Sequence, residues 1–366
     1  MLLATLLCAA LHLQTIVAHA VQPVMARYGI PGMAVGVVVN GETHVYNFGA
    51  TSKATGKPVD DDTLFEIGSV TKTFNATLAA YAQLTGKLSL TDMAGADFPA
   101  LRGSSFDRVP LVDLGTYTAG GLPLQFPDDI TTDAQAFEYY RQWKPAYAPG
   151  THRLYSNPSI MLLGRITATH MHGDFATLVQ QLIFAPLRMR HSFFAIPQAQ
   201  MANYAQGYRE SGAPIRMTLG PLANEAYGIR ITAGDLLRFL DANMRPGESG
   251  DAMLARAMRR TRTGYFRLGP MTQDLVWEQF TYPVQLRDLL YGNSNGVLLQ
   301  PNPVRRLEPP MPPSDNVLLN KTGSTNGFGA YVLMVPARKI AIVILANRSY
   351  PIAARVTAAY TILSQL

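Results

Sequence analysis

A serine and a lysine stand three residues apart in the segment IGSVTKTFNA, residues 67–76. At this spacing on a helix, Ser69 and Lys72 lie on the same face, so the ammonium group can reach the hydroxyl. A serine hydroxyl is a weak nucleophile at neutral pH and needs such a neighbour to react. The alternative is that Ser69 caps the helix and Lys72 faces water, and the motif alone does not separate the two.

A second short motif, YSN, spans residues 155–157, in a predicted loop between Pro149-Gly150 and a helix. Two ammonium groups nearby would favour the phenolate of Tyr155 and make it a usable base. The amide of Asn157 could orient a polar substrate. The alternative is a tyrosine that only anchors a turn, and the similar tripeptide YGN at residues 291–293 shows that the motif is weak by itself.

A third motif, KTGS, spans residues 321–324 at the start of a predicted strand over residues 328–335. A cation, a hydroxyl and backbone groups along a sheet edge suit a substrate that carries a carboxylate. The backbone N–H groups of Ser69 and Ser324 could together form an oxyanion hole. We expect the similar tripeptide RTG at residues 262–264 to lie in a helical, arginine-rich context without a following strand, and treat it as chance.

The elements that must position these motifs follow from the pattern of apolar residues. Residues 33–39 and 43–48 flank Asn40-Gly41, a dipeptide typical of a tight hairpin turn, and residues 328–335 and 340–347 form a second predicted hairpin. The pattern predicts an α+β fold, in which an antiparallel sheet built from both termini is flanked by helices and has an inserted, mostly helical region. The Pro-rich residues 308–315 are predicted to form a rigid surface loop. Helices are predicted over residues 69–84, 132–143, 159–170, 176–183, 233–243 and 352–366.

The first 20 residues are apolar and end in Ala18-His19-Ala20, which fits a signal-peptide cleavage site. They contain no lysine or arginine, which suggests that the natural start lies upstream. We therefore predict a signal peptide over residues 1–20, export to the periplasm, and a single catalytic module over residues 21–366. The one cysteine, Cys8, lies in the leader, so the remainder has no thiol for a disulfide, a zinc site or a nucleophile.

The net charge of +6 favours anionic partners on average. The densest basic stretch, residues 256–267, has little aromatic interleaving and is predicted to be a solvated helix face, so we expect no nucleic-acid partner. The segment HMHGD, residues 170–174, matches a metal-ligand spacing. Because it follows a helix rather than a strand, we expect a helix C-terminal turn and no metal.

The order SxxK, YxN, KTG, with each motif on a suitable element, resembles the penicillin-recognising serine enzymes. The segments LFEIGSVTKTF, TYTAGGLPLQFPDD, YSNPSI, GPLANEAYGI, NKTGSTNGFGAYV and VILANRSYP are similar to the class C β-lactamases, the serine cephalosporinases, over nearly the whole chain after residue 20. The resemblance implies a β-lactamase/transpeptidase-like fold and β-lactam substrates, with cephalosporins preferred. It also implies antibiotic resistance, a monomer, no cofactor and no membrane association after signal cleavage.

The resemblance also implies residue roles. Ser69 would attack the β-lactam carbonyl to form an acyl-enzyme, and Lys72 and Tyr155 would manage its proton, with the identity of the first base left open. Lys321 would lower the pKa of Tyr155 and, with Thr322, receive the substrate carboxylate. Further substrate contacts would come from Gln125, Asn157, Tyr227, Ser324 and Arg355.

Three residues depart from the family's pattern: Ile352, where many members have asparagine, and Asp274 and Val276, where glycines are usual. Two alternatives of the same fold remain open, a D-Ala-D-Ala peptidase or esterase, and a sensor that is acylated by β-lactams without turnover.

Overall fold

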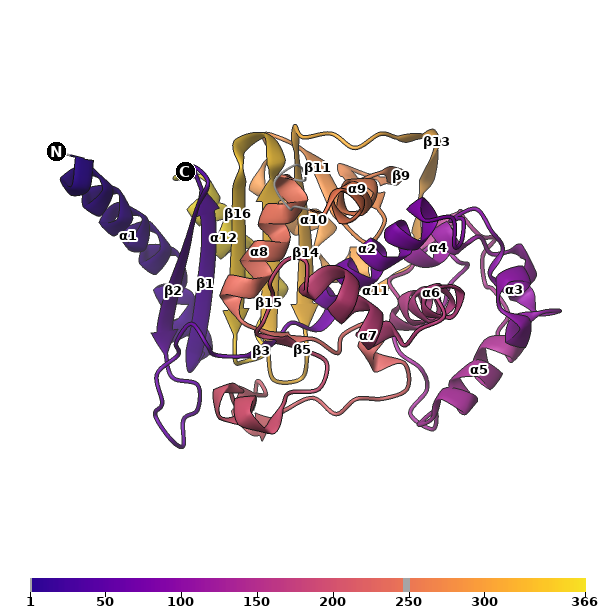
Figure 1. The fold of residues 1–366 in the computed structure, drawn as a ribbon, viewed down its shortest axis with the longest axis horizontal. Helices are drawn as coiled ribbons and strands as arrows, with labels where there is room; N and C mark the ends of the chain where they lie inside the picture. The colour runs from indigo at the N-terminus through magenta and orange to yellow at the C-terminus, as the bar shows by residue number, and fades with distance from the viewer. Residues whose placement is uncertain (1, 246–250) are drawn as a thin grey trace.

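The computed structural model describes residues 2–245 and 251–366. Within these ranges the largest sheet has nine strands, all antiparallel to their neighbours, in the order β13-β9-β10-β11-β14-β15-β16-β1-β2. The two ends of the chain meet in it, because β1 pairs with β16 (Figure 1). The predicted α+β fold with a sheet built from both termini is therefore confirmed. The terminal strands are β1 (Gly32–Val39), β2 (Glu42–Gly49), β14 (Val317–Ser324), β15 (Gly329–Val335) and β16 (Ile340–Ala346).

Four further strands come from a part of the chain where the sequence predicted none. Three of them have five residues or fewer. The residues of β10 (Met271–Asp274) and β11 (Glu278–Thr281) do not alternate between apolar and polar, so period-2 patterning misses these two strands. The expectation for RTG at residues 262–264 is wrong, because β9 (Gly264–Leu268) begins at its glycine. The KTGS motif likewise ends strand β14 and does not start a strand.

The Pro-rich loop prediction is wrong in part, because β13 (Arg305–Met311) includes Pro309 and Pro310. This strand is the outermost one and pairs with β9 alone, with an irregular register between Arg306 and Met311. An edge strand tolerates proline because N–H groups that face outward need no partner in the sheet. The prolines also make this edge a poor template for another strand.

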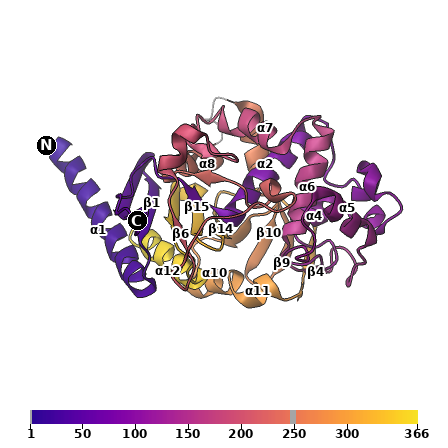
Figure 2. The same ribbon diagram turned by 90° about the horizontal axis from the view of Figure 1, so that it is seen from below.

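Helices cover both faces of the sheet (Figures 1 and 2). On one face, α12 (Ile352–Leu363) and α10 (Leu286–Gly292) pack with α1 (Leu2–Tyr28) in one apolar cluster. On the other face, α8 (Ala233–Met244) contacts β1 and β16. The side chains of β1 alternate between the two clusters, since Val35 and Val37 belong to the first and Ala34 and Val38 to the second.

The predicted signal-peptide boundary at Ala20 falls inside α1. This helix contacts α12, and Leu13, Val17 and Val21 are buried in the shared cluster. A chain that began at Val21 would lack the first two of these side chains, each of which stabilises the fold by about 1.5–3 kcal/mol when fully buried. Removal of residues 1–20 would therefore take away part of this apolar cluster. Among the described residues, no helix is long and apolar enough to cross a membrane.

The inserted helical region lies at one end of the sheet (Figure 1). Its helices pack around α2 (Thr71–Leu84), which is buried along most of its length and contacts α6 (Asn157–His170) and α9 (Ala252–Arg260). A capping box between Thr132 and Gln135 starts α5 (Asp133–Gln142), close to the predicted start. The remaining short helices here are α3 (Ala94–Asp97), α4 (Leu111–Gly115) and α7 (Phe175–Val179), which continues as a π turn over Gln180–Phe184.

The HMHGD segment forms the predicted helix C-terminal turn. α6 ends at His170, and His172 has a φ of 54°, which turns the chain away from the helix axis. In the described part of the chain, no three histidine, cysteine or carboxylate side chains are grouped so that they could hold a metal ion.

Two of the departures from the family's pattern lie in the tight turn between β10 and β11. The turn is closed by a hydrogen bond from the Asp274 N–H to the Trp277 carbonyl at 2.9 Å. Val276, inside the turn, has a φ of 71°. Val276 donates its N–H to Gly115 O at 3.0 Å. The side chain of Asp274 is fully buried, and neither carboxyl oxygen has a hydrogen-bond partner among the described residues. Burial raises the pKa of Asp274 well above its usual range, against the opposing effect of Arg262 and Arg267.

We expect Asp274→Asn to stabilise the protein at alkaline pH more than at acidic pH. A carboxyl group whose pKa is raised in the folded state holds its proton more tightly there than in the unfolded chain. The wild type therefore loses stability as the pH rises above ~4, by up to about 1.4 kcal/mol per pH unit until the folded pKa is passed. Urea unfolding at pH 4.5 and pH 8.5 measures the effect. The exposed Asp128→Asn is the control, and an equal stability gain at both pH values would contradict the prediction.

Candidate active site

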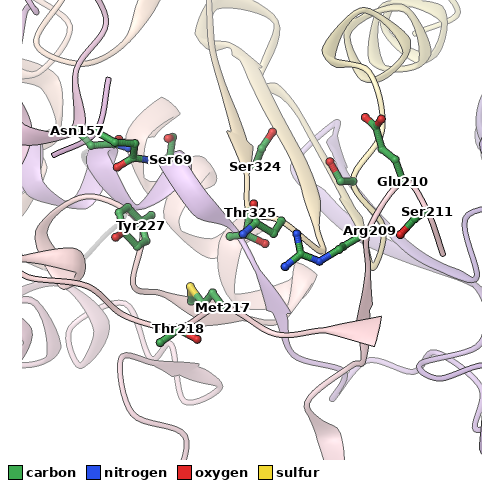
Figure 3. A pocket seen from close by; sticks show the side chains of 13 residues that line it. Ser69, Asn157, Arg209, Glu210, Ser211, Met217, Thr218, Tyr227, Ser324 and Thr325 are labelled. Atoms are coloured by element: carbon green, nitrogen blue, oxygen red, sulfur yellow. The ribbon is translucent and has the colours of Figure 1, made fainter. Parts of the chain in front are cut away.

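The candidate nucleophile lies on a short turn that leads into a buried helix. Gly68–Val70 forms a 3-10 turn, and α2 follows directly, so Ser69 and Lys72 are one turn apart. Lys72 Nζ donates to Ser69 Oγ at 2.7 Å and to the Ala226 carbonyl at 3.1 Å. Lys72 is fully buried, whereas Ser69 reaches a cavity (Figure 3). The alternative in which Lys72 faces water is therefore wrong.

Two glycines allow this turn to lie directly against β14. Gly68 has a φ of 49°, and a Cβ atom there would come within 2.5 Å of the Ser324 carbonyl oxygen. A Cβ atom on Gly323 would come within 1.9 Å of the Ile67 carbonyl oxygen. Side chains at either position would push the strand and the turn apart. The contact brings the backbone of Ser324 beside that of Ser69, as the predicted oxyanion hole requires.

Tyr155 lies between the two lysines. The Lys72 and Lys321 ammonium groups are 5.3 and 4.9 Å from the centre of its ring. The backbone there is held by Ser156, which caps α6 by accepting the Ser159 N–H at 3.0 Å. Tyr155 itself is almost fully buried, and the Ser69 hydroxyl lies close enough to lower the pKa of its phenol group. The structure thus brings Ser69, Lys72, Tyr155 and Lys321 into one cluster.

The cluster's charges bring two pKa values close together. Burial lowers the pKa of Lys72, Tyr155 raises it and Lys321 lowers it, with a result of about 8. Burial raises the pKa of Tyr155, but Lys321, Lys72 and the hydrogen bond from Ser69 together lower it to about 8. Groups with pKa values near the working pH can both accept and return a proton. Either Lys72 or Tyr155 can therefore take the proton of Ser69.

A buried ion network supports the cluster from behind. Glu278, at the start of β11, lies 3.7 Å from Lys321 Nζ and 3.2 Å from Arg153 Nη2, and all three side chains are buried. Arg153 Nε also donates to Gln273 Oε1 at 2.7 Å. Buried charges of this kind are tolerated only when they are paired and hydrogen-bonded. The network holds Lys321 beside Tyr155.

Ser69 opens into a cavity of about 680 Å³. Of the predicted substrate-contacting residues, Gln125, Asn157, Tyr227 and Ser324 line it (Figure 3). Asn157 is buried, and its Oδ1 atom has no hydrogen-bond partner among the described residues. The other lining residues are Arg209, Glu210, Ser211, Met217, Thr218, Thr325, Asn326 and Ser349.

Three predicted substrate contacts do not line the cavity. Two of them are neighbours on β14, where Lys321 is fully buried and Thr322 is 5% exposed. Arg355 is 1% exposed and lies behind Ser324, where Nη1 donates to Gly323 O at 2.6 Å and to Ser324 Oγ at 2.9 Å. Nη2 donates to Tyr350 O at 2.6 Å. Because these donors are already engaged, the structure places Arg355 as a support of the strand end and not as a direct contact for a carboxylate.

The sequence reasoning missed several residues of this site. Glu278 and Arg153 lie beside motif residues in the folded chain. In the sequence each is a single charged residue, so no pattern marked it as part of the site. Glu66 directly precedes IGSVTK and is buried, and a carboxylate within the apolar run LFEI was the available signal. The residues of the loop near Met217 have no characteristic spacing, so nothing in the pattern pointed to them.

This fold and this cluster of serine, two lysines and tyrosine define a serine enzyme of the penicillin-recognising type. The "Beta-lactamase" family model matches residues 17–366. A β-lactamase of Pseudomonas fluorescens is 46% identical over 97% of this chain and 99% of its own. The chain therefore belongs to the β-lactamase family.

Solved structures place it with class C. A class C β-lactamase in complex with cefoxitin is 46% identical with a TM-score of 0.94, over 98% of this chain and 100% of the other. A D-alanine carboxypeptidase AmpC from Burkholderia cenocepacia is 51% identical with a TM-score of 0.92, over 97% of this chain and 99% of the other.

Proposed function

We propose that this protein is a class C serine β-lactamase that opens the β-lactam ring through an acyl-enzyme on Ser69. The observation that carries the proposal is the position of Ser69 Oγ, which lies 2.7 Å from Lys72 Nζ and opens into the cavity. Ser69 also lies beside Tyr155 and lowers the pKa of that tyrosine. The hydroxyl thus has two neighbours that can remove its proton and a space in front of it for a carbonyl group.

Acylation follows from this arrangement. The proton of Ser69 passes to Tyr155 or Lys72 as Oγ attacks the carbonyl carbon of the ring. The backbone N–H groups of Ser69 and Ser324 stabilise the negative charge that develops on the carbonyl oxygen. The C–N bond of the ring then breaks, and the nitrogen receives a proton from Tyr155.

Deacylation uses the same groups in reverse. A water molecule gives up its proton to Tyr155 as its oxygen attacks the ester carbon. The ester bond breaks, and Ser69 Oγ regains a proton, which restores the free enzyme. No step requires a cofactor.

The cavity can hold the rest of a β-lactam. The amides of Gln125 and Asn157 face the cavity and would bind the acyl side chain, and Tyr227 would form a wall beside it. The cationic Lys321 would attract the substrate carboxylate, with Thr322 and Ser324 as nearby hydroxyl donors. We propose cephalosporins as the preferred substrates.

A D-alanine carboxypeptidase is the second candidate, favoured by the 51% identity to the Burkholderia cenocepacia protein of that name. Two assays with purified protein, cephalosporin hydrolysis and D-Ala release, separate the alternatives. Multiple turnovers of a chromogenic cephalosporin support the β-lactamase. A single stoichiometric burst would show a sensor, and D-Ala release from a D-Ala-D-Ala peptide without cephalosporin turnover would show the peptidase.

We expect Lys321→Ala to move the pH-rate profile towards higher pH. Lys321 lowers the pKa of Tyr155, so its removal raises that pKa and reduces the phenolate fraction at neutral pH. The acidic limb of kcat/KM should shift upward, by roughly one pH unit or more, and KM should rise. Lys339→Ala, a change of an exposed lysine, is the control. An unchanged profile would count against the role of Lys321.

We also propose that the protein is exported to the periplasm, where it confers resistance to β-lactams as a monomer. The apolar leader supports export, and the burial of Leu13 and Val17 supports cleavage upstream of both. N-terminal sequencing of protein from a periplasmic extract tests the boundary, and light scattering tests the monomer. A mature chain that starts at Val21 would contradict the proposed cleavage boundary, and protein recovered only from the cytoplasm would contradict export.

A further inference from the structure

Glu66 is a buried carboxylate that the proposed mechanism does not use. It ends strand β3 (Phe65–Glu66), three residues before Ser69, and is 1% exposed. Its Oε1 atom accepts the Tyr204 hydroxyl at 2.5 Å and the Met217 N–H at 2.8 Å. Its Oε2 atom accepts the Thr325 hydroxyl at 2.5 Å. Both carboxylate oxygens are therefore bound by donors from other segments.

Two of these donors belong to walls of the cavity. Met217 lies in the segment between β7 (Pro214–Ile215) and the 3-10 turn Ala223–Glu225, and Thr325 directly follows β14. Both residues line the cavity in front of Ser69, and Figure 3 labels both of them there. Glu66 thus joins two separate walls through one carboxylate group.

The third donor to Glu66 is Tyr204, and it also helps to hold the Met217 segment in place. Arg216 stacks over the Tyr204 ring at 4.1 Å from its centre, and its guanidinium donates to the carbonyls of Tyr204 and Ala205. The residue before Met217 is therefore anchored to the same tyrosine that donates to Glu66. Hydrogen bonds to a charged group are worth roughly twice those between neutral groups, so the carboxylate is a stronger anchor than a neutral side chain would be.

We propose that Glu66 is a positioning residue that sets the separation of the Met217 and Thr325 walls, and thereby determines which β-lactam acyl side chains fit in the cavity. The proposal rests on the proposed function, and it adds a residue that selects among substrates. Without the carboxylate, the Met217 segment loses its anchor and can move outward. Bulky side chains then gain access, while small ones lose contacts with the wall.

The test compares two cephalosporins that share one nucleus and differ only in the acyl group, one small and one bulky and branched. For Glu66→Ala, we expect the ratio of kcat/KM for the bulky substrate to that for the small one to rise roughly tenfold, mainly through KM. Hydrogen exchange of the Met217 amide should become faster in the same variant. Glu66→Gln retains the shape of the side chain without its charge, and we expect a smaller shift in the same direction.

Asp235→Ala is the matched control. Asp235 is also a buried carboxylate, and it accepts the His191 N–H at 2.6 Å and the Ser192 hydroxyl at 2.9 Å, away from the lining residues. The Asp235→Ala variant should have a lower melting temperature but an unchanged ratio of kcat/KM between the bulky and the small substrate. An unchanged ratio in folded Glu66→Ala, or the same change in Asp235→Ala, would overturn the proposal. If Glu66→Ala does not fold, Glu66→Gln decides by the same criterion. Absence of turnover in the wild type would instead refute the proposed function.

Discussion

Replacing Ser69 by alanine is expected to lower kcat for a cephalosporin by about 10⁴-fold or more, because removal of an enzyme's nucleophile usually costs at least this much. The acyl-enzyme cannot form without Oγ, and Lys72 and Tyr155 are then left without the group that they activate. Residual activity would come from the oxyanion hole and substrate binding alone. Steady-state hydrolysis measures the loss, and intact-mass spectrometry should show that the covalent adduct is absent.

The matched control for this change is Ser349→Ala. Ser349 lines the same cavity but has no lysine three residues later, since position 352 is isoleucine. It should retain turnover within a few-fold. The melting temperature of Ser69→Ala should stay close to that of the wild type, because Ser69 is partly exposed and lies on a turn. Turnover by Ser69→Ala at the wild-type rate would refute the assignment of the nucleophile.

Replacing Tyr155 by phenylalanine is expected to lower kcat by about 10²–10⁴-fold, the usual contribution of general acid-base catalysis. The change removes one of the two candidate acceptors for the proton of Ser69, and it removes the group proposed to protonate the ring nitrogen. The ring remains to pack between Lys72 and Lys321. The wild-type rate should rise with pH as Tyr155 ionises, with a midpoint near its pKa of about 8. Loss of this dependence in the variant would identify Tyr155 as the base, whereas a retained dependence near pH 8 would identify Lys72.

Tyr117→Phe makes the same chemical change next to the site. Its ring centre is 4.6 Å from that of Tyr155, but burial raises its pKa well above the usual value and keeps it neutral. We expect its kcat to change by no more than a few-fold, with the pH dependence retained. Equal losses in Tyr117→Phe and Tyr155→Phe would show that the tyrosine pair is needed for packing and not for proton transfer.

The terminal strands and long helices could be predicted because each depends on local pattern. Asn40-Gly41 between two apolar runs indicates a hairpin, and the register of β1 with β2 has that turn at its end. The motif residues were identifiable for a similar reason. A serine and lysine three residues apart on a helix must approach one another, whatever the rest of the chain does.

The strands of the middle segment and the supporting charges could not be predicted in this way. β11 is stabilised by its place beside β14, and Glu278 is stabilised by Arg153, which is 125 residues away in the chain. Such pairs depend on contacts that have no fixed spacing. Asp274 shows the same limit, because a carboxylate in a polar segment predicts exposure and only the packing reveals that it is buried.

The sequence by itself predicted the class of fold and the three motifs, with Ser69 and its neighbouring lysine as candidates, since these follow from residue type, short spacing and the resemblance to a family. The tertiary structure alone decided how the site is assembled. It brings Tyr155 between two lysines from separate elements, and this placement lowers the pKa of the tyrosine. It also shows that Arg355 supports the strand end and that Glu66 joins two cavity walls. Electrostatic and hydrogen-bonding effects depend on distance in space, and only folding sets those distances.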